Sequence, residues 1–182
     1  IIDGTNKTIR YVGTFGSSQS KDNTIWAGIY VLQVYKTTAT IKNIKLTGAN
    51  AALLVNGSNV KLEGTIDVSG NGFGGIELGK GKDVTTSPHL SLDSINQIIN
   101  TTETENAPTL WTPIDTEGAI LEVAGVKYTL KANEEFSLLE LNKYFSQEEN
   151  PETSVSFPKT SFLFLFSSII LLGIGLKLKE TS

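Results

Sequence analysis

"IKNIKLTGANAALLVNGSNVKLEGTIDVSGNGFGGIEL", residues 41–78, is the stretch that decides the fold. Its second half contains one regular alternation of apolar and polar residues. The apolar positions are Val60, Leu62, Ile66 and Val68, and the polar positions between them are Lys61, Glu63, Thr65 and Asp67. Successive side chains of a β-strand point to opposite faces, so the segment predicts a strand with an apolar inner face and a charged outer face. Gly64 is predicted to leave one gap on the inner side.

Two different strand motifs recur around this segment in the same order. "IKLTG" (44–48) matches "IDVSG" (66–70). "GIYV" (28–31), "ALLV" (52–55) and "GIEL" (75–78) share the pattern small, apolar, any, apolar, and follow one another at nearly the same spacing. A hairpin meander has no reason to repeat two motifs at one period. A chain that coils and stacks equivalent strands does.

The period selects among coiled architectures. Leucine-rich repeats would need regular Leu and Asn positions, and helical repeats would need a 3.6-residue periodicity. Neither is present, so we predict a mainly β fold, a right-handed parallel β-helix with coils of about 22 residues. In residues 41–78 and the coils flanking them, the chain resembles the pectate-lyase-like β-helix proteins of the adhesin-like, cell-surface branch. The resemblance implies a fold and not one activity, because a single fold supports many functions.

The pattern changes after residue 100. "NAPTLWTP" (106–113) reads as a turn that closes the coil, and "AILEVAGVKYTLK" (119–131) reads as two strands around Ala124-Gly125. "NEEFSLLELNKYF" (133–145) has apolar residues at helical spacing, with Asn133 as a candidate N-cap. The end of a coil needs a cover for its core, so we expect these segments to form a small strand–helix cap.

Composition excludes several classes of function. The formal net charge is −4 and the chain has no cysteine. Nucleic acid is therefore not an expected partner, and disulfides, thiolate metal sites and cysteine nucleophiles are excluded. We expect no metal site and no cofactor. The chain begins at Ile1 without a signal peptide, and we read it as the C-terminal part of a longer precursor.

A glycine-rich stretch mimics two nucleotide-binding motifs. The residues involved are Gly70, Gly72, Gly74, Gly75, Gly79 and Lys80. Both motifs require a helix after the loop, whereas "GIEL" here belongs to the strand repeat, and Gly81 replaces the Ser or Thr that would bind magnesium. We interpret the glycines as corners between strands. His89 is the only histidine. A Ser-His-Asp triad is not indicated, because no serine lies in a nucleophile-elbow pattern. We therefore assign no catalytic residue.

Outward-facing charges leave three interpretations open. By the spacing of the repeat, Lys45 lies one coil from Asp67, about 4.8 Å away across neighbouring strands. This arrangement predicts a solvated ion pair. The alternatives are a glycan-binding surface formed by Trp26, Tyr30, Lys45 and Asp67, or a polysaccharide-cleaving site of the kind that the family resemblance implies. Trp26, Tyr30 and Tyr35 serve equally well as packing residues.

The C-terminal segment has three parts. Residues 162–176 are apolar apart from two serines and two glycines, and are shorter than the about 20 residues that a spanning helix needs. We expect an apolar helix that contacts the membrane transiently. Lys177 and Lys179 follow, and positive charge after an apolar segment retains that end in the cytoplasm.

The motif before the apolar segment is "FPKTS", which comprises Phe157, Pro158, Lys159, Thr160 and Ser161. With the apolar segment and the lysines, it resembles the cell-wall sorting signal of Gram-positive surface proteins, Leu-Pro-x-Thr-Gly. Phe157 and Ser161 depart from that pattern. The resemblance implies a sortase as partner, cleavage between Thr160 and Ser161, and transfer of the Thr160 carbonyl to a peptidoglycan precursor.

These features predict a secreted protein anchored covalently in a Gram-positive cell wall. Its expected parts are coils and closing turn (1–112), cap (113–145), polar spacer (146–156) and sorting signal (157–182). We expect an adhesin or binding protein with a host or polysaccharide ligand, and not an enzyme. Two alternatives remain: a wall-bound polysaccharide lyase or hydrolase with catalytic coils upstream of Ile1, and a passive stalk.

Overall fold

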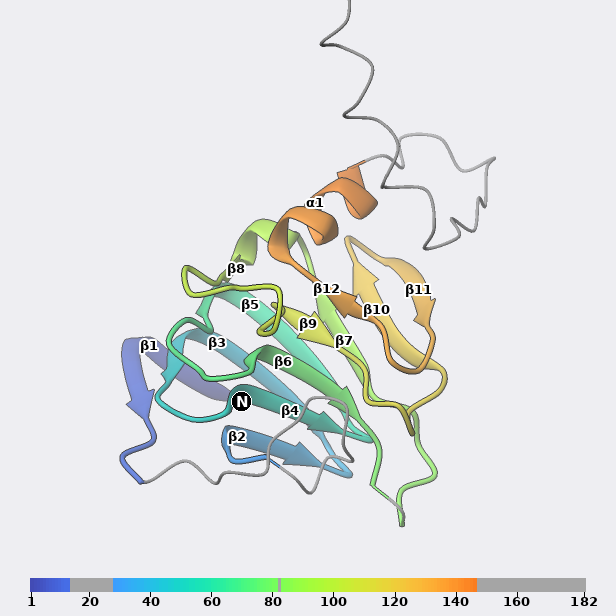
Figure 1. The fold of residues 1–182 in the computed structure, drawn as a ribbon, viewed down its shortest axis with the longest axis horizontal. Coiled ribbons are helices and arrows are strands. Elements are labelled where there is room, and N and C mark those ends of the chain that lie inside the picture. Colours follow the sequence, from blue (N-terminus) through green and yellow to red (C-terminus); the bar gives the residue numbers. More distant parts are fainter. Residues whose placement is uncertain (14–27, 82, 147–182) are drawn as a thin grey trace, which may run out of the picture. The chain divides into compact units, whose positions relative to one another are not determined.

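The computed structural model describes residues 1–13, 28–81 and 83–146, all within one compact unit, Ile1–Glu148. This part of the chain is mainly β, with parallel sheets and one short α-helix, α1 (Leu138–Ser146). The first seven strands alternate between two sheets, which Figure 1 shows as two stacked series running from blue strands to orange strands. The expected mainly β class is therefore confirmed.

Seven strands form the first sheet. They are β1 (Ile2–Arg10), β3 (Thr38–Thr47), β5 (Asn59–Asp67), β7 (His89–Leu92), β10 (Ala119–Val123) and β11 (Val126–Leu130), in this order, with β8 (Ile98–Ile99) paired to β5. All pairs in this sheet are parallel except β10 with β11. The 3-10 helix η2 (Ile95–Gln97) precedes β8.

Five strands form the second sheet. In spatial order they are β12 (Glu135–Phe136), β9 (Leu110–Trp111), β6 (Gly74–Gly79), β4 (Ala51–Asn56) and β2 (Tyr30–Tyr35). Only β12 runs antiparallel to its neighbour. Each parallel strand thus pairs with a strand one turn of the chain away, and not with the strand that follows it in sequence.

The strand registers confirm two of the expected spacings and correct a third. Lys45 pairs with Asp67 and Leu53 pairs with Ile76, as the repeat predicts. The motif match "GIYV" to "ALLV" would pair Tyr30 with Leu54, but Tyr30 pairs with Ala51. This register places Leu32 beside Leu53, so the core-facing motif of β2 begins three residues later than "GIYV" suggested.

The core lies between the two sheets and consists of rows of stacked aliphatic side chains. Leu53, Ile76 and Leu110 form one such row across the second sheet, and each has no exposed surface. The four apolar residues that the alternation at 60–68 placed inside are all buried. The expected gap at Gly64 is wrong. Gly64 is exposed at a β-bulge opposite Asn43 and does not face the core.

Buried asparagines hold the corners where the chain leaves β3 and β5. Asn50 Oδ1 accepts the Ile29 N–H (3.0 Å), and Asn71 Oδ1 accepts the Ala49 N–H (3.0 Å). Asn71 Nδ2 also donates to the Leu46 carbonyl (3.0 Å). Each asparagine side chain therefore hydrogen-bonds to backbone groups of the preceding corner, as buried polar groups require. These bonds keep successive corners aligned.

The segment expected to form a strand–helix cap extends both sheets. β10 adds in parallel to β7, and β10 and β11 form the hairpin expected around Ala124-Gly125. β12 adds to β9 in the other sheet. Helix α1 follows and buries Leu141 in the core.

The expected N-cap of α1 is wrong. Asn133 lies in a turn before β12 with φ of +57°, and the helix begins only at Leu138. Ser137 caps it: the Ser137 Oγ accepts the Glu140 N–H (3.1 Å), and Glu140 accepts the Ser137 N–H (2.7 Å). This reciprocal pair is a capping box. The expected apolar helix at 162–176 lies outside the described residues.

Candidate functional site

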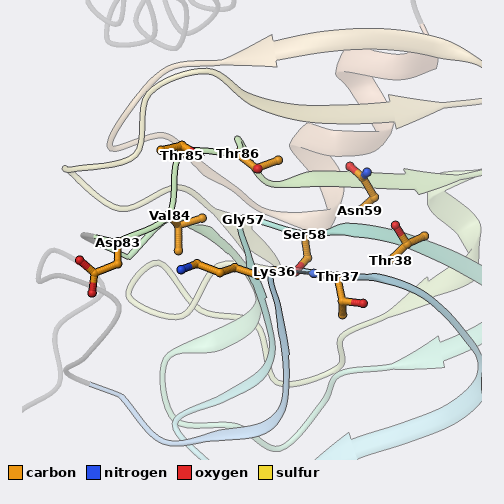
Figure 2. Close-up of a pocket in the computed structure, with 10 residues that line it drawn as sticks. All are labelled: Lys36, Thr37, Thr38, Gly57, Ser58, Asn59, Asp83, Val84, Thr85 and Thr86. Carbon is orange, nitrogen blue, oxygen red and sulfur yellow. Dashed lines mark hydrogen bonds between the residues drawn. The ribbon is translucent and has the colours of Figure 1, made fainter.

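A groove of about 440 Å³ lies where three successive turns of the chain stack at one corner of the two sheets (Figure 2). The turns are those between β2 and β3, between β4 and β5, and between β6 and β7. The lining residues are Lys36, Thr37, Thr38, Gly57, Ser58, Asn59, Asp83, Val84, Thr85 and Thr86. Most of these side chains carry a hydroxyl or an amide, so the groove is polar and nearly uncharged.

Backbone and side-chain hydrogen bonds fix the three turns against one another. The Asn59 N–H donates to the Thr37 carbonyl (3.0 Å), and the His89 N–H donates to the Ser58 carbonyl (2.9 Å). The buried Ser58 hydroxyl accepts the Thr37 N–H (3.1 Å). The floor of the groove is therefore held in place by its own paired polar groups.

Gly57 lets the third turn approach the second. Its φ is +52°, and an added Cβ would lie 1.9 Å from Val84 Cγ1 and 2.9 Å from the Thr86 carbonyl oxygen. Glycine is the residue that adopts this backbone conformation without strain. The loop 83–86 can close one side of the groove only because position 57 has no side chain.

The outer face of the first sheet carries a series of ion pairs. Lys42 pairs with Asp3 (3.3 Å), Lys61 with Glu63 (2.9 Å) and Lys45 with Asp67 (2.7 Å). On the same face, His89 Nε2 lies within hydrogen-bond distance (3.0 Å) of Glu122 Oε2. Burial alone would raise the pKa of Asp67, but hydrogen bonds from Lys45 and Ser69 hold it below its usual value. The expected Lys45–Asp67 pair is thus present, and its geometry is that of a surface ion pair.

Of the four residues of the expected glycan surface, the three that the structure describes do not come together. Lys45 and Asp67 lie on the first sheet, whereas Tyr30 lies on the second, and Trp26 is outside the described residues. The Tyr30 hydroxyl donates to Glu77 Oε2 (2.7 Å), so this tyrosine is engaged within the protein. Tyr35, by contrast, is 45% exposed at the end of β2, next to the groove.

Glu77 is the most perturbed acid among the described residues. It lies on β6 opposite Trp111 and is 4% exposed. Burial, opposed by the Tyr30 hydroxyl, raises its pKa to about 7; the charge of Asp115 adds to the rise and the Trp111 indole opposes it. Within the described part of the chain, Glu77 Oε1 and Trp111 Nε1 have no partner at hydrogen-bond geometry. Glu77 is not among the residues that line the groove.

The other candidate motifs have structural roles or lie outside the described residues. "GGIELG" forms β6 and not a helix, so the glycine-rich loop lacks the helix N-terminus that phosphate binding needs. Among the described residues no group of three or more His, Asp or Glu side chains is placed to hold a metal, and no helix is long and apolar enough to cross a membrane. Residues 157–161, Lys177 and Lys179 lie outside the described residues.

Comparison with known proteins gives no relative: no family model, no curated protein and no solved structure matches this chain.

Sequence reasoning missed the groove, Glu77 and the corner asparagines. The asparagines had a readable signal, since "GAN" at 48–50 and "SGN" at 69–71 occupy equivalent places in the repeat. Glu77 also had one, because it is the only charged residue in the apolar strand "GGIELG". The groove had none, since a hollow between turns depends on how the turns stack.

Proposed function

We propose that this chain belongs to a Gram-positive cell-surface binding protein, an adhesin in the broad sense, which a sortase attaches to peptidoglycan. The observation that carries the proposal is the order of parts at 157–182: the motif "FPKTS", the apolar stretch 162–176, and two lysines. This order resembles a sorting signal. The protein is the substrate of that reaction and not its catalyst.

We further propose that the alternating strands are coils of a right-handed parallel β-helix. The nearly constant spacing between paired strands supports this, as in the pairs Lys45 with Asp67 and Leu53 with Ile76. The aligned asparagine corners support it as well. Handedness follows from a general rule, since connections between parallel strands of one sheet are right-handed in nearly all proteins. Such a coil would present a rigid polar surface, which suits a binding protein.

The wall attachment is tested in the native host. Muramidase digestion should release the protein with wall peptide linked to Thr160, as read by mass spectrometry. Thr160→Ala should abolish this species, because the substitution removes the threonine of the motif that the sortase recognises and cleaves. Thr153→Ala, a threonine substitution in the preceding spacer, serves as the matched control and should leave attachment unchanged.

One result would overturn the attachment. If detergent alone extracts the protein with residues 162–182 still present, the segment is a simple membrane anchor. Display on the surface would then remain, but the sortase and peptidoglycan would not be partners.

A further inference from the structure

We propose that the corner groove is a binding site for a neutral oligosaccharide, with one sugar ring placed against Tyr35. The inference names the ligand class for the proposed binding function and rests on that function for its biological meaning. Its physical basis is separate, because it depends on the side chains of the groove and not on the C-terminal segment.

The groove presents hydrogen-bonding groups that nothing else in the described structure uses. Thr38, Asn59 and Thr86 are solvent-accessible lining residues, and none of their side chains hydrogen-bonds to another residue in the described ranges. Figure 2 shows them on three neighbouring turns, with Thr38 and Asn59 at the first residues of β3 and β5 and Thr86 in the loop before β7. Hydroxyl and amide groups each supply both donors and acceptors, which is what a sugar hydroxyl requires.

The charges of the groove favour an uncharged ligand. Lys36 and Asp83 are the charged residues among those lining it, so the two formal charges cancel. In Figure 2 the Lys36 side chain extends toward the side where Asp83 and Val84 lie. A polyanion would be attracted by a cluster of cations, and a basic ligand by a cluster of acids. Neither cluster is present among the described lining residues.

Tyr35 supplies an apolar face next to these polar groups. The residue is 45% exposed, and the ammonium of Lys36, a lining residue, lies over the ring at 5.0 Å from its centroid. Lys36 therefore covers part of the ring, and the rest of the tyrosine is open to solvent beside this lining residue. An exposed aromatic face beside hydroxyl and amide groups matches a sugar ring, which has apolar C–H faces and a polar edge.

The dimensions also fit a chain of sugars. A volume of about 440 Å³ lies within the range of small-molecule sites. The groove crosses three stacked turns and is open, so it admits a segment of a longer polymer and not only a free monosaccharide.

The test uses the purified full chain in mild detergent, with defined hexasaccharides as probes. Neutral probes are cellohexaose, maltohexaose, mannohexaose and chitohexaose, and the charged probe is hexagalacturonate. Binding is followed by shifts of backbone amide signals in ¹H–¹⁵N spectra. We expect at least one neutral probe to shift the amides of residues 36–38, 57–59 and 83–86, and hexagalacturonate to leave them unchanged.

Variants separate stacking from hydrogen bonding. Tyr35→Ala should lower the affinity about tenfold while Tyr35→Phe, which keeps the ring, stays within about twofold. Thr38→Val and Thr86→Val should each lower it about fivefold. Thr8→Val, an exposed threonine on β1 away from the groove, should have no effect.

Three outcomes would overturn the inference. One is the absence of shifts in the groove with any neutral probe at about 10 mM, near the weak limit for specific binding. The second is binding of hexagalacturonate alone, and the third is shifts centred on Lys45 and Asp67 instead of the groove. None of these depends on wall attachment, which muramidase release tests separately, so the two proposals can fail independently.

Discussion

At the scale of single residues, Glu77 is the side chain whose chemistry departs most from its ordinary behaviour. A carboxyl on an otherwise apolar strand is packed beside Tyr30 and Trp111 with almost no contact with water. Burial of an ionised carboxylate is unfavourable unless it is fully paired. The structure meets this cost by favouring the protonated form, which makes stability depend on pH.

We predict that the protein loses stability as the pH rises from about 4.5 to about 7. The pKa of Glu77 is raised from 4.5 to about 7 in the folded state, so in this window the folded chain binds more protons than the unfolded chain. The stabilisation is present below pH 4.5 and is lost as the pH passes the folded-state value, by up to about 3 kcal/mol. Glu77→Gln keeps an acceptor for Tyr30 and removes the charge.

Chemical denaturation at pH 4 and pH 8 measures this effect. Glu77→Gln should match the unsubstituted protein at pH 4 and exceed its stability at pH 8. Glu105→Gln, a substitution at an exposed acid, is the control and should change neither value. Equal effects of Glu77→Gln at both pH values would show that folding does not raise the pKa of this carboxyl.

At the scale of elements, α1 shows how one polar interaction selects a helix boundary. Asn133 and Ser137 both precede apolar residues at helical spacing, and both are good N-cap types. The helix begins after Ser137 because Glu140 completes the capping box, and because Glu103 accepts the Leu138 N–H (2.6 Å). Residues 135–136 form strand β12 instead, which pairs with β9.

We predict that Ser137→Ala destabilises the protein by about 1 kcal/mol, since it leaves a helix-end N–H without its acceptor. Leu139→Ala is the control on the same helix. Leu139 is 62% exposed, so its loss should cost only a few tenths of a kcal/mol. Urea denaturation midpoints, with the m-value unchanged, measure the loss of stability in both variants. A loss for Ser137→Ala no larger than that for Leu139→Ala would contradict the capping role.

At the scale of the whole molecule, the arrangement is a series in which each inner strand is stabilised by its neighbours on both sides. β3, β4, β5 and β6 each have parallel partners on both sides, whereas β1 and β2 have one each in the described structure. Stability in such a series is a sum of nearest-neighbour terms. The ends should therefore open before the centre does.

We predict a gradient of amide hydrogen exchange that follows this order. Amides of β5 and β6 should exchange most slowly, with β1 and β11 faster by about tenfold or more, because local opening of an end strand needs less free energy. Native-state exchange followed by NMR gives the rates strand by strand. Uniform protection from β1 to β11 would show that the sheets open as one unit.

The sequence by itself determined the mainly β class, the inward face of β5, the corner at Gly70 and Gly72, and the spacing at which β3 pairs with β5 and β4 with β6. These follow from local alternation and from motifs close in sequence, and parallel stacking then places like side chains together. It also determined the layout of residues 157–182, on which the proposed attachment depends. The interpretation of the glycines as corners was wrong for Gly74, Gly75 and Gly79, which lie in strand β6 and not at a corner.

Only the tertiary structure decided the rest. The register of β2 differs by three residues from the one that the sequence motif predicts, because Leu32 and Val34 pack in the core. The motif alone did not show which apolar residues of this segment face inward. Tyr30 hydrogen-bonds to Glu77 and does not lie beside Lys45 and Asp67, because Tyr30 and Glu77 are on one sheet and Lys45 and Asp67 are on the other. The groove exists because Gly57 admits the loop 83–86, a close approach between segments about 30 residues apart along the chain that no local pattern records.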